Sequence, residues 1–218
     1  MSELETQSTT ITLDKNNEAI RCLCQNDATL ARLIEAAGPL RYKARHEEPF
    51  SFVVHQIIEQ MLSIRAANKI CGRLKDLCGG QITPQSVSVL SEQQIRSAGT
   101  SAAKAKSISA LAKSVASGEF SFDDLANLSD NEVTKRLTTF KGIGNWTAKM
   151  FLIFILDRPD VLPFEDATFV QSYKRLYKTQ DASPAAIKEK CAAWKPYSSV
   201  AARYLYEALD SDLYSRRE

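Results

Sequence analysis

A short glycine-containing segment, Phe140-Lys141-Gly142-Ile143-Gly144, is the part of this chain whose residue types most directly suggest chemistry. Glycine tolerates the positive φ of a tight turn, and two glycines around one aliphatic residue are typical of a turn between helices. A helix beginning near Asn145 would present bare backbone amides at this turn. Amides and the helix dipole favour an anion, so the segment could bind a phosphate. The alternative is an ordinary helix-to-helix turn.

The segments on both sides of this turn have the composition and periodicity of helices. The 218 residues include only 8 Gly and 7 Pro, fewer than is usual for a globular chain. No strong alternating strand pattern is present, so we predict an all-α chain of about ten helices after a flexible tail at residues 1–17. The predicted helices are 17–37, 50–77, 83–90, 91–98, 101–117, 122–128, 129–140, 145–156, 167–177, 184–194 and 196–209.

Charge and cysteine content indicate which binding partners and which cellular compartment to expect. The net charge of +2 does not require a polyanionic partner, but residues 96–113 carry four basic residues and no acidic one. Residues 135–178 carry eight basic residues against four acidic ones, so these stretches either face phosphates or form solvated helix faces. Five cysteines, no signal-like start and no long apolar run predict an intracellular protein without a membrane partner. Its place would be the cytoplasm or nucleoid of a bacterium, or a eukaryotic nucleus.

The sequence around the turn resembles the hairpin of the helix-hairpin-helix DNA glycosylase superfamily. Residues 137–148, LTTFKGIGNWTA, are similar to the family pattern Leu-x-x-Leu/Phe-Pro-Gly-Ile-Gly-x-Trp-Thr-Ala, with Lys141 in place of the proline. Residues 160–166, DVLPFED, fit the family's Asp-Val-x-Pro-x-x-Asp. Three further motifs follow the family order, at Gln60–Ala67, Gly99–Lys104 and Trp194–Tyr197, so that the resemblance covers residues 45 to 210.

This resemblance implies two helical subdomains with the active-site cleft between them. One subdomain would contain residues 18–48 and 157–218, and the other residues 49–156. Bifunctional members carry a Schiff-base lysine two residues after the second glycine, where this chain has Trp146, so lyase activity is not expected. The iron–sulfur branch needs four closely spaced cysteines, and only Cys191 follows Asp166. The branch of the family that the chain still resembles is the 3-methyladenine DNA glycosylase II type, in its compact form.

The resemblance assigns catalysis to Asp166. An alkylated purine already carries positive charge and leaves readily, so hydrolysis mainly needs a negative group that stabilises the oxocarbenium ion and orients water. Glu165 is the rival carboxylate, whose other role would be to cap the following helix. The expected activity is flipping of an alkylated base and hydrolysis of its N-glycosidic bond, which leaves an abasic site. A non-catalytic binder of damaged or abasic DNA with the same fold is the alternative.

Other residues are assigned to DNA by their places in these motifs. A flipped base leaves a gap for an apolar side chain, here Met61 or Leu62. Aromatic faces attract a cationic base, so the expected walls of its pocket are Trp146, Phe164, Trp194 and Tyr197, with core packing as the alternative for each. The other expected DNA contacts are Ser63, Lys104, Lys141, Gly142, Ile143, Gly144 and Thr147.

The family also implies a structural Na⁺ or K⁺ at the hairpin. Its ligands would be the backbone carbonyls of Thr138, Phe140 and Gly142. No other cofactor is expected. The expected partner is double-stranded DNA that contains alkylated bases, bound by a monomer.

Overall fold

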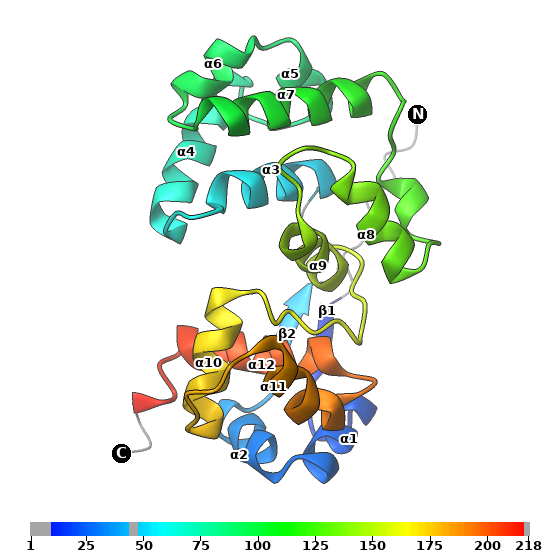
Figure 1. The fold of residues 1–218 in the computed structure, drawn as a ribbon, viewed down its shortest axis with the longest axis vertical. Coiled ribbons are helices and arrows are strands. Elements are labelled where there is room, and N and C mark those ends of the chain that lie inside the picture. The colour runs from blue at the N-terminus through cyan, green and yellow to red at the C-terminus, as the bar shows by residue number, and fades with distance from the viewer. Residues whose placement is uncertain (1–9, 44–47, 216–218) are drawn as a thin grey trace. The chain divides into compact units, whose positions relative to one another are not determined.

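The computed structural model describes residues 10–43 and 48–215 and confirms the predicted, mostly helical fold (Figure 1). The chain divides into two compact units. Unit 1 comprises Met1–His46 and Asp157–Glu218, and unit 2 comprises Glu47–Leu156. Within the described residues, none of the helices has both the length and the apolar character that a membrane span requires.

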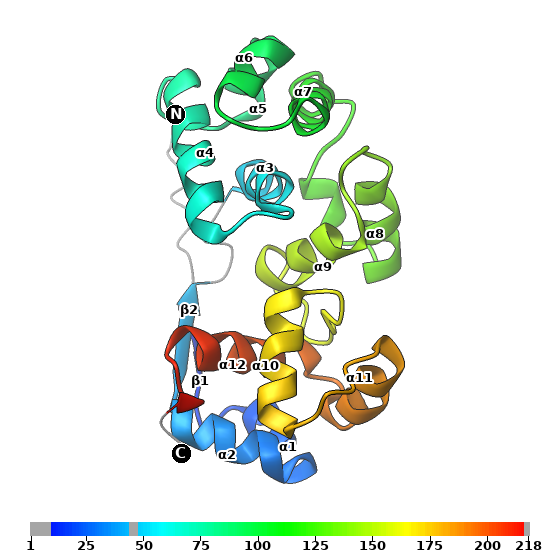
Figure 2. The same cartoon turned by 60° about the vertical axis from the view of Figure 1, so that its left-hand side comes forward.

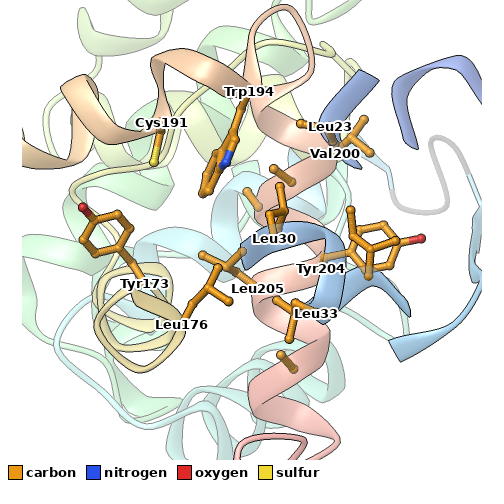
Figure 3. Close-up of a cluster of buried hydrophobic side chains, with 14 of the residues drawn as sticks. Leu23, Leu30, Leu33, Tyr173, Leu176, Cys191, Trp194, Val200, Tyr204 and Leu205 are labelled. Carbon is orange, nitrogen blue, oxygen red and sulfur yellow. The ribbon is translucent and has the colours of Figure 1, made fainter. Parts of the chain in front are cut away.

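Unit 1 is built around α12, which packs against α10 and α2. Its core gathers apolar side chains from segments far apart in the sequence, including Leu30, Trp194 and Tyr204 (Figure 3). Its elements are β1 (Thr10–Leu13), α1 (Glu18–Asn26), α2 (Ala28–Ala37), β2 (Leu40–Lys43), α10 (Ala167–Tyr177), α11 (Pro184–Lys190), the 3₁₀ helix η2 (Cys191–Trp194) and α12 (Ser198–Asp210).

The prediction of a flexible tail is wrong for residues 10–17. Residues Thr10–Leu13 form β1, which pairs antiparallel with β2 and places Leu13 opposite Leu40. Leu13 is buried, and its carbonyl oxygen accepts a hydrogen bond from the Tyr204 hydroxyl at 3.1 Å. A four-residue strand has too few residues for a clear alternating pattern, and its stability comes from distant partners. Residues 1–9 of the predicted tail lie outside the described residues.

The predicted helix at 17–37 is two helices, because Asp27 ends α1 and caps α2. One Asp27 oxygen accepts hydrogen bonds from the backbone amides of Thr29 and Leu30. The other accepts from the Tyr177 hydroxyl and from Trp194 Nε1, the latter at 3.1 Å. Burial favours the protonated carboxyl, but these hydrogen bonds and the charge of Lys190 outweigh it and lower the pKa of Asp27.

Unit 2 is organised by α3, which packs against α4, α7 and α9. In Figure 2, α3 is seen almost end-on between α4 and α9. The elements are α3 (Pro49–Glu59), α4 (Ile64–Leu77), α5 (Pro84–Ser88), α6 (Glu92–Ser97), α7 (Ala102–Ala116), the 3₁₀ helix η1 (Asp123–Leu125), α8 (Asp130–Thr138) and α9 (Asn145–Phe154). The predicted helix at 50–77 is therefore two helices. They are interrupted at residues 60–63, where Met61 has a left-handed φ of 59°.

The hairpin between α8 and α9 requires glycine at one of its two glycine positions. Gly142 has a φ of 90°, and a Cβ atom there would lie 2.6 Å from Ser107 Oγ on α7. Gly144 has a φ of −103° and open space around it, so the expectation that it needs positive φ is wrong. The reason is its position as the N-cap of α9, where extended backbone is usual.

Replacing Gly142 by alanine is expected to destabilise the protein more than the same change at Gly118. Both positions have positive φ, but the space around Gly118 is open. Gly118→Ala therefore measures the conformational cost alone, about 1 kcal/mol. Gly142→Ala adds a steric clash and should cost roughly 2 kcal/mol more, measured by urea unfolding. Equal losses in the two variants would show that the hairpin moves away from α7 at little cost.

Candidate active site

The Asp166 carboxylate is buried and held in a defined orientation in unit 1. Its side chain is 8% exposed, and it is the N-cap of α10. Asp166 Oδ1 accepts a hydrogen bond from the Phe169 backbone amide at 2.7 Å. The role of helix cap considered for Glu165 thus belongs to Asp166, while Glu165 is exposed. A carboxylate fixed by a helix N-terminus is suited to stabilising a positive charge near it.

Tyr206 on α12 is a neighbour of Asp166 that the sequence analysis missed. Burial raises the pKa of Tyr206 well above its usual value, and the negative charge of nearby Asp166 raises it further. The Ser172 hydroxyl of α10 donates to the Leu205 carbonyl of α12 at 2.7 Å, which fixes the packing of the two helices. No motif contains Tyr206, so its proximity to Asp166 emerges only from this helix packing.

The segment that leads to Asp166 is anchored to the start of α12. Asp160 Oδ1 accepts hydrogen bonds from the backbone amide and the hydroxyl of Ser198. The Val161 amide donates to Ser199 Oγ at 2.9 Å, and the Ser199 amide donates to the Pro159 carbonyl at the same distance. The first residues of the DVLPFED motif therefore have a structural function, which is to fix the loop before the carboxylate.

The four aromatic residues predicted to surround the base have different environments. The prediction for Trp194 is wrong, because its side chain is fully buried, bonded to Asp27 and edge-on to Phe169 at a centroid distance of 6.2 Å. Phe164 is partly exposed and has Lys188 Nζ 4.4 Å from its ring centroid. These residues and Tyr197 belong to unit 1, whereas Trp146 is a partly exposed residue in the first turn of α9 in unit 2.

Tyr197 lines a hollow in unit 1 to which the Asp166 carboxylate does not contribute. This hollow has a volume of about 300 Å³, and its walls include Glu18, Asp157 and Arg203. Asp166 is not one of the described residues that line this hollow. Phe164 is partly exposed and lies two residues before Asp166 in the chain, and its contact with a base stays a prediction.

Of the two residues predicted to fill a gap in the base stack, Met61 is the more exposed. Its side chain is fully exposed at 101%, whereas Leu62 is 41% exposed. Met61 also occupies the left-handed backbone region, which costs about 1–3 kcal/mol for a residue that is not glycine. An apolar side chain held in water by a strained turn contributes nothing to the core. Ser63, next to this turn, is exposed and caps α4 by accepting a hydrogen bond from the Ala66 amide.

The hairpin presents only some of its predicted residues to solvent. Lys141 and Gly144 are exposed, and α9 begins directly after Gly144, which has no side chain to cap the helix amides. The direct DNA contacts predicted for Ile143 and Thr147 are wrong. Ile143 is 4% exposed with its amide bonded to the Phe140 carbonyl, and Thr147 is 0% exposed. Both residues anchor the hairpin from inside.

The Lys104 ammonium is also used within the protein. Lys104 Nζ donates to the carbonyl oxygens of Ile58 at 2.9 Å and Gln60 at 2.6 Å. Its partial burial lowers the pKa of this amine. This ammonium thus contacts the end of α3, where helix carbonyls carry partial negative charge, and the contact of Lys104 with DNA stays a prediction.

Two of the three proposed cation ligands at the hairpin, the carbonyls of Phe140 and Gly142, already accept hydrogen bonds. The carbonyl of Phe140 accepts from the Ile143 amide at 3.0 Å, and that of Gly142 accepts from Gln60 Nε2 at 2.9 Å. Across the described residues, His, Cys, Asp and Glu side chains form no group of three that could hold a metal ion. We therefore assign no step to a cation at this position.

Comparisons with known proteins match this architecture over most of the chain. Residues 54–196 match the family described as HhH-GPD superfamily base excision DNA repair protein. DNA-3-methyladenine glycosylase 1 of Schizosaccharomyces pombe is 30% identical, over 91% of this chain and 92% of the relative. The alkylbase DNA glycosidase-like protein mag2 of the same organism is 26% identical, over 83% of this chain and 88% of the relative.

Solved structures agree with these relatives. The DNA-3-methyladenine glycosidase of Bacillus halodurans has a TM-score of 0.79 at 33% identity, covering 93% of this chain and 94% of that one. The S. pombe 3-methyladenine DNA glycosylase Mag1, in complex with abasic DNA, has a TM-score of 0.80 at 30% identity, covering 89% and 97%. The matched region contains the Met61 turn, the hairpin and Asp166. This chain therefore belongs to the HhH-GPD superfamily of base excision DNA repair proteins.

Proposed function

We propose that this protein is a monofunctional DNA glycosylase that releases alkylated bases such as 3-methyladenine and leaves an abasic site. The observation that carries the proposal is the buried, oriented carboxylate of Asp166 at the N-terminus of α10. Support for the substrate class comes from the 3-methyladenine glycosylases to which the chain is similar. In this proposal its partner is double-stranded DNA. The protein acts as a monomer in the cellular compartment that contains this DNA.

In the proposed reaction Asp166 stabilises the positive charge that develops on the deoxyribose. The C1′–N bond breaks and its electron pair leaves with the alkylated base, which was cationic and becomes neutral. The carboxylate balances the oxocarbenium ion, water forms a bond to C1′, and the water proton is lost. The Phe169 amide keeps Asp166 in one orientation, so little reorganisation is needed as charge develops.

The DNA is held in this proposal by two features of unit 2. The amides beginning at Gly144, together with the exposed Lys141, bind a backbone phosphate regardless of sequence. Met61 enters the gap that the flipped base leaves in the stack. At the position where bifunctional relatives carry a lysine, Trp146 has no amine for a Schiff base, so strand cleavage is not part of the proposed activity.

Asp166→Asn is expected to reduce base release from methylated duplex DNA by about a hundredfold or more while leaving abasic-DNA affinity within a few-fold. Asparagine is also a good N-cap, so the variant should retain the hydrogen bond to Phe169 and remain folded. The measurement is single-turnover release of 3-methyladenine, with Glu165→Gln as the matched control because Glu165 is exposed.

The outcomes separate the candidate activities. If Glu165→Gln lost base release while Asp166→Asn released bases normally, Glu165 and not Asp166 would be the catalytic carboxylate. A wild-type protein that binds abasic DNA but releases no base would instead be a damage-binding protein. In active reactions the product strand should stay intact until alkali is added, and a borohydride-trapped adduct would contradict the monofunctional assignment.

Gly144→Val is expected to lower the affinity for undamaged and for abasic duplexes by the same factor, about tenfold for one lost phosphate contact. The backbone at Gly144 is extended and its surroundings are open, so valine should fit without disturbing the fold. It would, however, crowd an approaching phosphate. Gly144→Ala provides a smaller control, and fluorescence anisotropy at fixed salt provides the affinities. Unchanged affinity of a folded Gly144→Val protein would identify the hairpin as an ordinary turn.

A further inference from the structure

Gln60 connects two parts of unit 2 that are far apart in the sequence. It is the C-cap of α3 and directly precedes Met61. Its Nε2 donates to the Gly142 carbonyl at 2.9 Å and to Thr147 Oγ1 at 3.4 Å. These acceptors lie in the hairpin loop and in the first turn of α9. The residue before the exposed methionine is thus bonded to the segment that presents the phosphate-binding amides.

Lys104 holds the same point from a third element, α7. Its ammonium donates to the carbonyls of Ile58 and Gln60, at the end of α3. Ser107, one turn further along α7, is the residue that Gly142 packs against. Helix α7 therefore contacts both the Met61 turn and the hairpin, and Gln60 joins these two segments directly.

The strain at Met61 gives these hydrogen bonds a purpose. A left-handed conformation at a fully exposed methionine relaxes unless its neighbours hold it. On one side the turn continues into the α4 cap at Ser63, and the Leu62 amide donates to the Glu59 carbonyl at 2.8 Å. On the other side the constraint comes from Gln60, through both its side chain and its carbonyl.

We propose that Gln60 and Lys104 are positioning residues for lesion recognition, which hold the Met61 turn in fixed register with the phosphate-binding hairpin. Because of this register, a duplex whose phosphate sits on the hairpin presents its vacated stack to Met61. The inference rests on the proposed roles of Met61 and the hairpin in DNA binding, but not on Asp166 or on base release. Neither residue needs to touch DNA in order to act.

The expected signature is a loss of preference for abasic over undamaged DNA that depends on Met61. The probes are two duplexes of identical sequence, one carrying a tetrahydrofuran abasic analogue, with dissociation constants measured by anisotropy. Gln60→Ala should lower the preference about fivefold in the wild-type background and less than twofold in a Met61→Ala background, because coupled residues are not additive. Gln56→Ala, which truncates a buried glutamine on the same helix, should leave the preference unchanged.

Lys104→Met and Lys106→Met form a second matched pair. Both remove one positive charge from α7, but Lys106 is exposed and Lys104 is bonded to α3. Lys104→Met should lower the preference for abasic DNA in the same Met61-dependent way, while Lys106→Met should not. If Lys104 instead contacts DNA directly, its loss would weaken both duplexes equally and flatten the salt dependence of binding, which would overturn the proposal.

The remaining outcomes are also decisive. Equal effects of Gln60→Ala in both backgrounds, or no effect in a protein with unchanged circular dichroism, would overturn the positioning role. A wild-type protein with no preference for the abasic duplex would overturn it as well. Failure of the proposed enzymatic activity would appear separately, as absence of base release by a protein that still shows the Met61-dependent preference.

Discussion

At Gly142 the backbone of the hairpin lies so close to Ser107 of α7 that a Cβ atom would be 2.6 Å from the serine hydroxyl. This close approach, at a φ of 90°, fixes the hairpin against α7 just before α9 begins. It places the Gly142 carbonyl within reach of Gln60, and it starts α9 at Asn145 with an N-cap that has no side chain. The start of α9, where we propose that a phosphate binds, and the exposed Met61 are therefore supported by the same packing contact.

A buried carboxylate has a comparable function in unit 1. Asp27 caps α2 and accepts hydrogen bonds from Tyr177 of α10 and Trp194 of η2. Trp194 packs edge-on against Phe169, whose backbone amide binds Asp166. The proposed catalytic group is thus oriented by the helix start of α10, and α10 is oriented by a polar contact inside the core. Removing charge from Asp27 would disturb the site without touching it.

Residues that motif reasoning placed correctly are those whose role is local. The turn at Gly142 follows from short-range backbone chemistry, which residue type reveals, whereas the helix cap considered for Glu165 is Asp166, one residue later. Trp194, Lys104 and Thr147 belong to the same set of motifs, yet they bond to groups 44 to 167 residues away and support the site from within. A motif records that a residue type is needed at a position. It does not distinguish a ligand contact from an internal one.

Helix boundaries and the small sheet show the same dependence on distant partners. Asp27 divides one amphipathic stretch because its second oxygen is satisfied by Tyr177 and Trp194, which the sequence places far away. The strand β1 exists because β2 and Tyr204 bind its backbone. Tyr206 reaches Asp166 only because α10 and α12 pack together. None of these contacts leaves a local pattern.

Whether the Asp166 carboxylate stabilises positive charge on the sugar, as we propose, can be measured by comparing two duplexes. One carries a pyrrolidine in place of the sugar, with a protonated ring nitrogen, and the other carries the uncharged tetrahydrofuran. A site built for an oxocarbenium ion binds the cationic analogue more tightly, by about tenfold or more. We expect this preference for the wild-type protein and for Glu165→Gln, and we expect its loss in Asp166→Asn. An undiminished preference in Asp166→Asn would contradict this proposal.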